Sequence, residues 1–204
     1  MTDDAAIKAP QVEGKSKITA RQLLSLSSGL SADFPPRTDL TVPNTYRASI
    51  FNLSATAPGE AVIYSPSTFQ AFGVYFELKS GGRLTADYSV TGGKAILNYQ
   101  QARFFPSIGR QVGVWSSDAS GRATLPQGAF LTSREWLNFG QSLLQGGKWE
   151  GKTILSESRL RECSTFNNAA FAGYGLALWS NRPVGDTYTA GVDGLPTNDV
   201  NLIN

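Results

Sequence analysis

The chain has 204 residues, of which 41% are hydrophobic, and its 18 Lys and Arg nearly balance its 16 Asp and Glu. This length suits one globular domain, and a near-neutral charge without long runs of one sign gives no electrostatic footprint for nucleic acid. The chain has no histidine and one cysteine, which excludes Ser-His-Asp catalysis, the usual zinc sites and an internal disulfide.

These totals limit the chemistry that the chain can carry. We expect no metal and no cofactor, and an enzyme built from this chain must use Lys, Tyr, Asp or Glu as its base. No apolar run approaches the ~20 residues of a membrane-spanning helix, and the first residues are acidic and polar, unlike an export signal. We expect no membrane span, and the compartment stays open between periplasmic or exported and cytoplasmic.

The first predicted helix begins after a polar lead-in of residues 1–18. Thr19 and Gln22 have the spacing of a capping box, in which each side chain bonds the other residue's backbone amide. Gly29 stands where a left-handed cap would end this helix. Residues 31–59 contain four prolines, which predict an extended or turning surface path with short helical turns at most.

A second helix is predicted to begin at Ser65. Ser65 suits the N-cap, Pro66 suits the first helical position, and phenylalanines follow at helical spacing up to a stop at Gly81 and Gly82. Residues 94–105 predict another helix, and residues 116–121 have the composition of a tight turn.

The C-terminal half contains a second capping box, Thr132 with Glu135. It predicts a helix that ends at Gly146 and Gly147, followed by a reversing loop over residues 148–152 and a short helix from Ser156. Residues 173–179 alternate large and small side chains and are the best strand candidate in the chain.

Short catalytic motifs are missing from the sequence. Gly-x-Ser-x-Gly, Ser-x-x-Lys, His-Glu-x-x-His and the phosphate loop do not occur, so the chain supplies no recognisable nucleophile. Tyr64 stands out instead, because it directly precedes a predicted helix N-terminus, where free amides and the helix dipole favour a phenolate that could act as a base. The alternative is a hydrophobic staple, in which Tyr64 packs against Phe69.

Four blocks of the sequence, in order and at plausible spacing, resemble the class C β-lactamase-related serine hydrolases and penicillin-binding proteins, with an esterase-like member as the nearest type. The second block is similar to the family's Tyr-Ser-Asn segment. The blocks are residues 18–30, 58–65, 128–156 and 173–176.

The resemblance implies an α+β fold of the β-lactamase/transpeptidase type, present here mainly as its helical lobe. It implies a single partial domain, with residues 19–170 as the helical lobe and residues 171–204 as the start of the returning sheet. The nucleophile helix with Ser-x-x-Lys would lie upstream, and most sheet strands, with a Lys-Thr-Gly-like strand, downstream. The chain would then be truncated at both ends and inactive alone.

The resemblance also implies a function, which is the cleavage of a small-molecule ester or amide by a Ser-Lys-Tyr acyl-enzyme mechanism with Tyr64 as general base. Ser65 and Pro66 would contact the substrate. Pro66 stands where the family often has Asn, and its ring offers no donor, which favours esterase-like relatives over β-lactamases. A peptidase is not distinguished from an esterase.

Two questions stay open at this point. The chain could instead be a noncatalytic binding or scaffold protein derived from this lobe. The aromatic residues Phe34, Tyr46 and Phe51 could line the rim of an acyl pocket, or they could pack locally, as aromatic side chains in such segments more often do.

Overall fold

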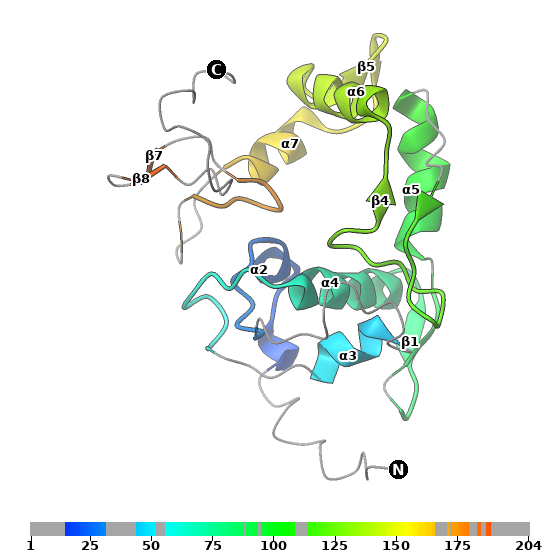
Figure 1. Ribbon diagram of the computed structural model, residues 1–204, viewed down its shortest axis with the longest axis vertical. Helices are drawn as coiled ribbons and strands as arrows, with labels where there is room; N and C mark the ends of the chain where they lie inside the picture. Colours follow the sequence, from blue (N-terminus) through cyan, green and yellow to red (C-terminus); the bar gives the residue numbers. More distant parts are fainter. Residues whose placement is uncertain are drawn as a thin grey trace.

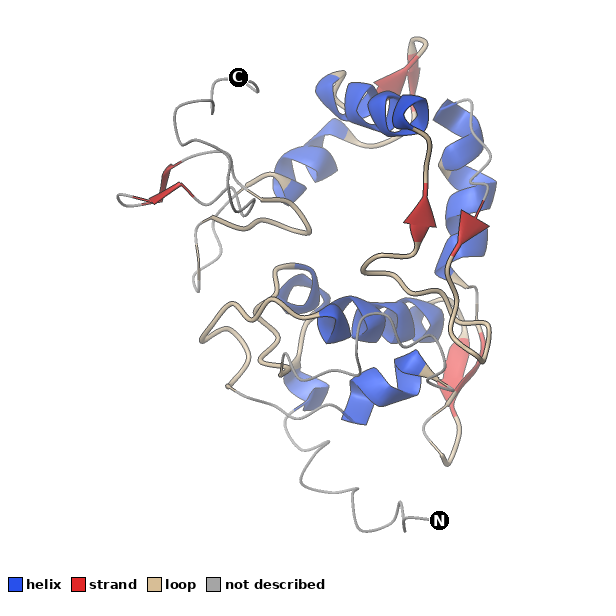
Figure 2. Cartoon of the chain, viewed as in Figure 1, coloured by secondary structure: helices blue, strands red, loops and turns tan. Residues whose placement is uncertain are grey.

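The computed structural model consists mainly of helices, joined by short hairpins (Figure 2). Its strands form four two-stranded antiparallel sheets among the described residues. This mixture of helix and strand agrees with the predicted α+β class. The structure describes residues 15–31, 44–51, 56–87, 89–93, 95–108, 114–165, 171, 173–179, 183–184 and 187–188.

The first α-helix, α2, spans Ala20–Leu24 and follows a short 3-10 turn, η1, at Lys15–Lys17. The predicted capping box is present, because the Thr19 hydroxyl accepts from the Gln22 amide and the Gln22 side chain accepts from the Thr19 amide. The expectation that Gly29 ends this helix was wrong. The chain already turns away at Leu26, which has a φ of 58°, and Gly29 adopts its own φ of 79° where the Thr56 carbonyl leaves no room for a Cβ.

Helix α3, Thr45–Phe51, packs against the long helix α4, Pro66–Lys79. We expected residues 31–59 to follow a surface path, and for α3 this was wrong. Thr45, Tyr46 and Ser49 are buried, because α3 lays one side on α4. Tyr46 therefore packs locally in the core, while Phe34 and the side chain of Phe51 lie outside the described residues.

Helix α4 ends as predicted, with Ser80 as C-cap and Gly81 at a φ of 105°. Strand β1, Gly82–Leu84, follows and pairs with β2, Val90–Gly92. Helix α5, Ile96–Arg103, lies inside the predicted range of 94–105 and continues into the 3-10 turn η2, Phe105–Ile108.

Strand β3, Val114–Trp115, pairs with β4, Ala129–Phe130, and the loop between them contains the predicted tight turn, closed by a hydrogen bond from the Gly121 amide to the Asp118 carbonyl. Helix α6, Ser133–Leu144, begins with the predicted Thr132–Glu135 capping box. The reversing loop is a hairpin of β5, Lys148–Trp149, and β6, Lys152–Thr153, before helix α7, Glu157–Cys163.

The prediction of a strand over residues 173–179 was wrong. The segment turns back on itself, so that Tyr174 and Trp179 form an isolated bridge and the Gly175 amide bonds the Leu178 carbonyl at 2.8 Å. Ala177 takes a φ of 58°, which an extended strand does not allow. A two-strand hairpin follows, formed by β7, Pro183–Val184, and β8, Thr187–Tyr188.

The apolar core lies between α3, α4 and β2. Tyr46, Val74 and Val90 form its centre, and Ile50, Leu78 and Leu125 pack around them. Helices α2, α3 and α4 lie together at one end of the molecule, α5 runs along one side, and α6 and α7 lie at the other end (Figure 1). The start of α4 therefore lies beside α2, on the side away from α5.

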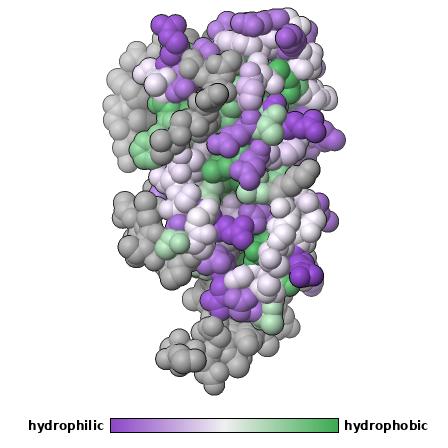
Figure 3. Space-filling view, turned by 90° about the vertical axis from the view of Figure 1, so that its right-hand side faces the viewer, coloured by the Kyte–Doolittle hydropathy of each residue, from purple (hydrophilic) through white to green (hydrophobic). Residues whose placement is uncertain are grey.

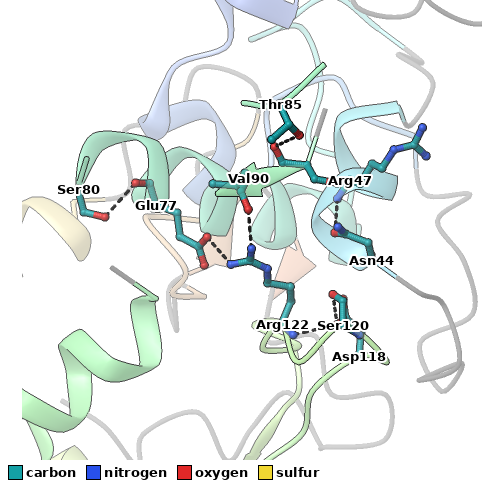
Figure 4. A network of polar contacts seen from close by, with 10 residues as sticks. Asn44, Arg47, Glu77, Ser80, Thr85, Val90, Asp118, Ser120 and Arg122 are labelled. Carbon is teal, nitrogen blue, oxygen red and sulfur yellow. Dashed lines mark hydrogen bonds and ion pairs between the residues drawn. The ribbon is translucent and has the colours of Figure 1, made fainter. Parts of the chain in front are cut away.

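A buried polar network joins α3 and α4 to the loop between β3 and β4, and Figure 4 shows the part of it around Asp118, Ser120 and Arg122. Asp118 is 5% exposed and accepts hydrogen bonds from the backbone amides of Thr45, Ser120 and Arg122. The Gln70 side chain donates to the Thr45 hydroxyl and accepts from the Leu125 amide. These bonds fix a loop that has little regular structure of its own.

The surface along α5 mixes hydrophilic and hydrophobic residues (Figure 3). Several large apolar side chains of α6 are exposed, namely Trp136, Leu137 and Leu144. Among the described residues, none of the helices combines the length and the apolar character that crossing a bilayer requires.

Candidate functional site

Tyr64 lies where the sequence predicted, directly before the N-cap of α4. Its side chain is 55% exposed. Ser65 accepts from the Ser67 amide and donates its hydroxyl to the Ser31 carbonyl at 2.9 Å, and Pro66 opens the helix. The helix start is thus anchored by short-range capping and by two hydrogen bonds to the distant Ser31 carbonyl, from the hydroxyls of Ser65 and Ser67, so the backbone that carries the phenol is held in place.

The segment that leads to Tyr64 is fastened to the turn after α2. The Ile63 amide donates to the Leu26 carbonyl at 2.9 Å, and the Gly59 amide donates to the Ser27 carbonyl at 2.8 Å. Leu26 itself is completely buried in a left-handed conformation that is unfavourable for a leucine. Because burial of this side chain offsets the backbone strain, the turn and the approach to Tyr64 form one unit.

The segment 171–179 comes back to the same place from far along the chain. The ring of Trp179 lies 5.8 Å from the ring of Tyr64, centroid to centroid, at a tilt of 38°. The Ala177 amide donates to the Leu24 carbonyl at 2.8 Å, and the Leu176 amide donates to the Cys163 carbonyl at 3.0 Å. The segment around Tyr64 therefore meets residues that directly follow the block 173–176 on which the resemblance also rests.

A second tyrosine lies beneath this pair. Tyr174 is 3% exposed, and its ring contacts that of Trp179 edge to face at 4.8 Å. Burial raises the pKa of Tyr174 to about 12, and the nearby Tyr64 acts in the same direction. Tyr174 therefore stays protonated, and the exposed phenol of the site is that of Tyr64.

The three site residues named from the sequence lie side by side but differ in access. Tyr64 is exposed, Pro66 is half-buried, and Ser65 is 2% exposed with its hydroxyl bonded to Ser31 and to Ser67. A substrate contact of the Ser65 hydroxyl would require that hydroxyl to exchange one of these bonds. The roles of general base and of substrate contact stay predictions.

Trp179 is the residue that sequence reasoning missed. Its only sequence signal is the alternation of residues 173–179, which favoured a strand and thus no particular partner for the indole. The proximity of Trp179 to Tyr64 depends on the turn at Ala177, whose φ no local pattern indicates.

The described residues offer little for metal binding. Among them no group of three or more Cys, Asp or Glu side chains could hold a metal ion. Cys163 is partly buried near α2, and burial raises the pKa of its thiol, which lowers the fraction present as thiolate.

Comparison with known proteins finds a similar structure but no match in sequence. No protein-family model and no curated protein matches the chain. Among solved structures, the chain is similar to the crystal structure titled "putative beta-lactamase from Bacteroides dorei DSM 17855", with a TM-score of 0.62 and 17% sequence identity over 82% of this chain. This chain has a β-lactamase-like fold.

The chain spans about half of that neighbour, because the match covers 54% of the neighbour's length. At this level of identity the likeness extends to the fold alone. It agrees with the fold that the sequence resemblance implied, and the catalytic chemistry has to be argued from the residues.

Proposed function

We propose that this chain is part of a serine hydrolase that cleaves ester or amide bonds through an acyl-enzyme, with Tyr64 as the general base. The observation that carries the proposal is an exposed phenol directly before the N-terminus of α4 in a β-lactamase-like fold. The capping bonds of Ser65 and the bonds of residues 59 and 63 to the α2 turn support it, because a base must be held at a fixed place.

In the proposed reaction a serine Oγ attacks the carbonyl carbon, and its single proton passes by way of a paired lysine to the Tyr64 oxygen. The tetrahedral intermediate collapses as the leaving oxygen or nitrogen takes that proton, and the acyl group stays on the serine. Water then gives a proton to the same oxygen and attacks the acyl carbon, which releases the acid and the free serine. Tyr64 thus accepts and returns one proton in each half of the cycle.

The serine and the lysine of this scheme are proposed to lie outside these 204 residues, since the sequence has no Ser-x-x-Lys. The chain would be one partial domain, with residues 1–18 as a lead-in, 19–170 as the helical lobe and 171–204 as the beginning of the returning sheet. The match to about half of the neighbour's length supports this view. Without the nucleophile the chain alone is expected to be inactive, because the covalent step is lost entirely.

The proposed substrate is a small-molecule ester or amide, with esters favoured over β-lactams. Pro66, at the first position of α4, has neither a backbone donor nor a side-chain amide to offer a ligand. Ser65 and Pro66 are proposed to contact the substrate through their backbone and ring atoms, since the Ser65 hydroxyl is already bonded.

A noncatalytic binding or scaffold role is the second candidate. The absence of Ser-x-x-Lys from the sequence favours it, because a lobe that never joins a nucleophile has no acyl transfer to perform. The two candidates differ in what the coding DNA on either side of this segment encodes.

The test is to sequence the flanking coding DNA and to assay the product of the complete reading frame against p-nitrophenyl butyrate and nitrocefin. We expect an upstream Ser-x-x-Lys, ester hydrolysis, and a loss of about 10²- to 10⁴-fold in kcat for Tyr64→Phe. Tyr75→Phe is the matched control, because Tyr75 is a second exposed tyrosine, on α4 itself, and its change should leave kcat within twofold.

Two outcomes would overturn the hydrolase proposal. Start and stop signals at the ends of this segment would leave the noncatalytic role. An active complete protein in which Tyr64→Phe behaves like Tyr75→Phe would keep the hydrolase but remove Tyr64 from the reaction.

A further inference from the structure

We infer that Trp179 is a substrate-binding residue, whose exposed indole binds an aryl group of the ester or amide beside Tyr64. The inference rests on the proposed function and adds the class of substrate that the site prefers. It starts from an observation that the hydrolase scheme does not use, namely that a second exposed aromatic ring lies 5.8 Å from the ring of the proposed base.

The indole of Trp179 packs against two other aromatic rings. Tyr174 contacts it edge to face at 4.8 Å with planes at 84°, and Phe171 lies at 6.5 Å with planes at 73°. Tyr174 is 3% exposed, whereas Trp179 is 42% exposed. One part of the indole is therefore packed on a buried ring, and another part faces outward.

The backbone that carries Trp179 is also fixed. Residues 174 and 179 form a bridge across the turn, and the amides of Leu176 and Ala177 bond the carbonyls of Cys163 on α7 and Leu24 on α2. In Figure 1 this segment passes close to α2 at the end of the molecule where α4 begins. A ligand would thus meet an indole that is already ordered, which reduces the entropy lost on binding.

The chemistry of the surroundings selects the kind of group that binds. The rings that contact the indole belong to Tyr64, Tyr174 and Phe171, and an apolar group placed on Trp179 would leave water for a surface of aromatic carbon. An aryl ring could also stack on the indole in an offset or edge-to-face geometry. A small acyl group such as acetyl would cover little of this surface.

Other exposed tryptophan side chains do not share this position. Trp136 on α6 is 63% exposed, but its ring stacks on the ring of Phe139. Helix α6 lies against η2. Trp136 therefore serves as a control with the same side chain at a different place.

The experiment uses the 204-residue chain labelled with 5-fluorotryptophan, in which 19F NMR resolves the four tryptophans one by one. The probes are ethyl phenylacetate and benzyl acetate, with ethyl acetate as the reference without a ring. We expect the two aryl esters to shift the Trp179 resonance in a saturable way and to bind about 3- to 30-fold more tightly than ethyl acetate. The Trp136 resonance should not move.

Substitutions test the role of the indole. Trp179→Ala should abolish the preference for aryl esters, Trp179→Phe should keep part of it, and Trp136→Ala should leave it unchanged. Trp179→Phe keeps a ring against Tyr174, so the comparison remains valid if Trp179→Ala fails to fold. Equal binding of aryl and alkyl esters by the unsubstituted chain, or unchanged preference in Trp179→Phe and Trp179→Ala, would overturn the inference.

The failure of this inference differs from the failure of the proposed function. In the complete protein, loss of hydrolysis in Tyr64→Phe together with an unchanged ratio of kcat/KM for ethyl phenylacetate over ethyl acetate in Trp179→Ala would leave the hydrolase and reject the role of Trp179. Aryl binding at Trp179 in a protein without hydrolase activity would reject the proposed reaction and retain the binding site.

Discussion

The carboxylate of Glu77 forms an ion pair with the guanidinium of Arg122 at 2.5 Å, and the Glu77 side chain is only 2% exposed. Arg122 also donates to the Val90 carbonyl at 2.6 Å and lies over the ring of Tyr46. One arginine from the loop between β3 and β4 thus neutralises a buried charge on α4 and bonds strand β2. The loop and the core are coupled through this pair.

Removal of the arginine is expected to destabilise the fold strongly. Arg122→Ala leaves the Glu77 carboxylate buried without its counterion, which should lower the free energy of unfolding by about 3–5 kcal/mol. The control is Arg161→Ala, whose pair with Glu157 on α7 is largely exposed and is worth about 0.3–0.5 kcal/mol. Urea denaturation followed by circular dichroism measures both, and equal effects of the two substitutions would contradict the assigned role of Arg122.

Two glycines in helices should respond to the same substitution with opposite sign. A Cβ on Gly73 would lie 2.5 Å from the Tyr46 hydroxyl oxygen and 2.9 Å from a Leu125 methyl carbon, so Gly73→Ala should cost about 1–3 kcal/mol. A Cβ on Gly140 of α6 would meet nothing within 4 Å, so Gly140→Ala should stabilise by about 0.5–1 kcal/mol.

The same denaturation experiment measures both glycine variants. Tyr46→Phe removes the hydroxyl oxygen but keeps the ring carbon Cζ, which lies still nearer the added Cβ, so combining it with Gly73→Ala should restore little of the lost stability. A destabilising Gly140→Ala, or a neutral Gly73→Ala, would show that the packing around α4 or α6 differs from the one described.

The turn between β5 and β6 contains a residue with a strained backbone. Glu150 has a φ of 47° and Gly151 a φ of 77°, as in the two-residue turns that favour Asn-Gly. Glu150→Asn should raise the melting temperature and stabilise by up to about 1 kcal/mol, because Asn tolerates the left-handed region better. Glu150→Gln removes the same charge without that tolerance, and an equal gain in Glu150→Gln would assign the effect to charge.

Two buried tyrosines, Tyr46 and Tyr174, should ionise only in strongly alkaline solution. Burial raises the pKa of Tyr174 to about 12, and burial together with Glu77 raises the pKa of Tyr46 further. Because these values exceed the value of about 10 in an unfolded chain, the stability that both groups contribute is complete below pH 10 and is lost as the pH rises beyond it.

The near-ultraviolet absorbance of phenolate, recorded with circular dichroism during an alkaline titration, checks this expectation. We expect a late ionisation step that coincides with loss of helix, and Tyr174→Phe should reduce its amplitude. Ionisation of all seven tyrosines in one step in a still folded chain would contradict the burial of Tyr46 and Tyr174.

The sequence by itself determined the helix caps and the glycines that end helices in this chain. The capping boxes at Thr19 and Thr132, the cap at Ser65 and the glycines after α4 and α6 were predicted correctly, because each of these interactions closes within about three residues. The place of Tyr64 before α4 follows from the same short-range rules. The position of Tyr64 in the candidate site could therefore be predicted from the sequence alone.

Only the tertiary structure decided what these elements meet. The burial of Tyr46, the contact of Trp179 with Tyr64 and the turn at Ala177 all depend on bonds between residues far apart in the chain, such as the Ala177 amide and the Leu24 carbonyl. The alternation in residues 173–179 is compatible with a strand or with a turn, and a backbone strain at one alanine is offset by distant partners. Local spacing carries no information about such partners, which is why the aromatic half of the site could not be predicted.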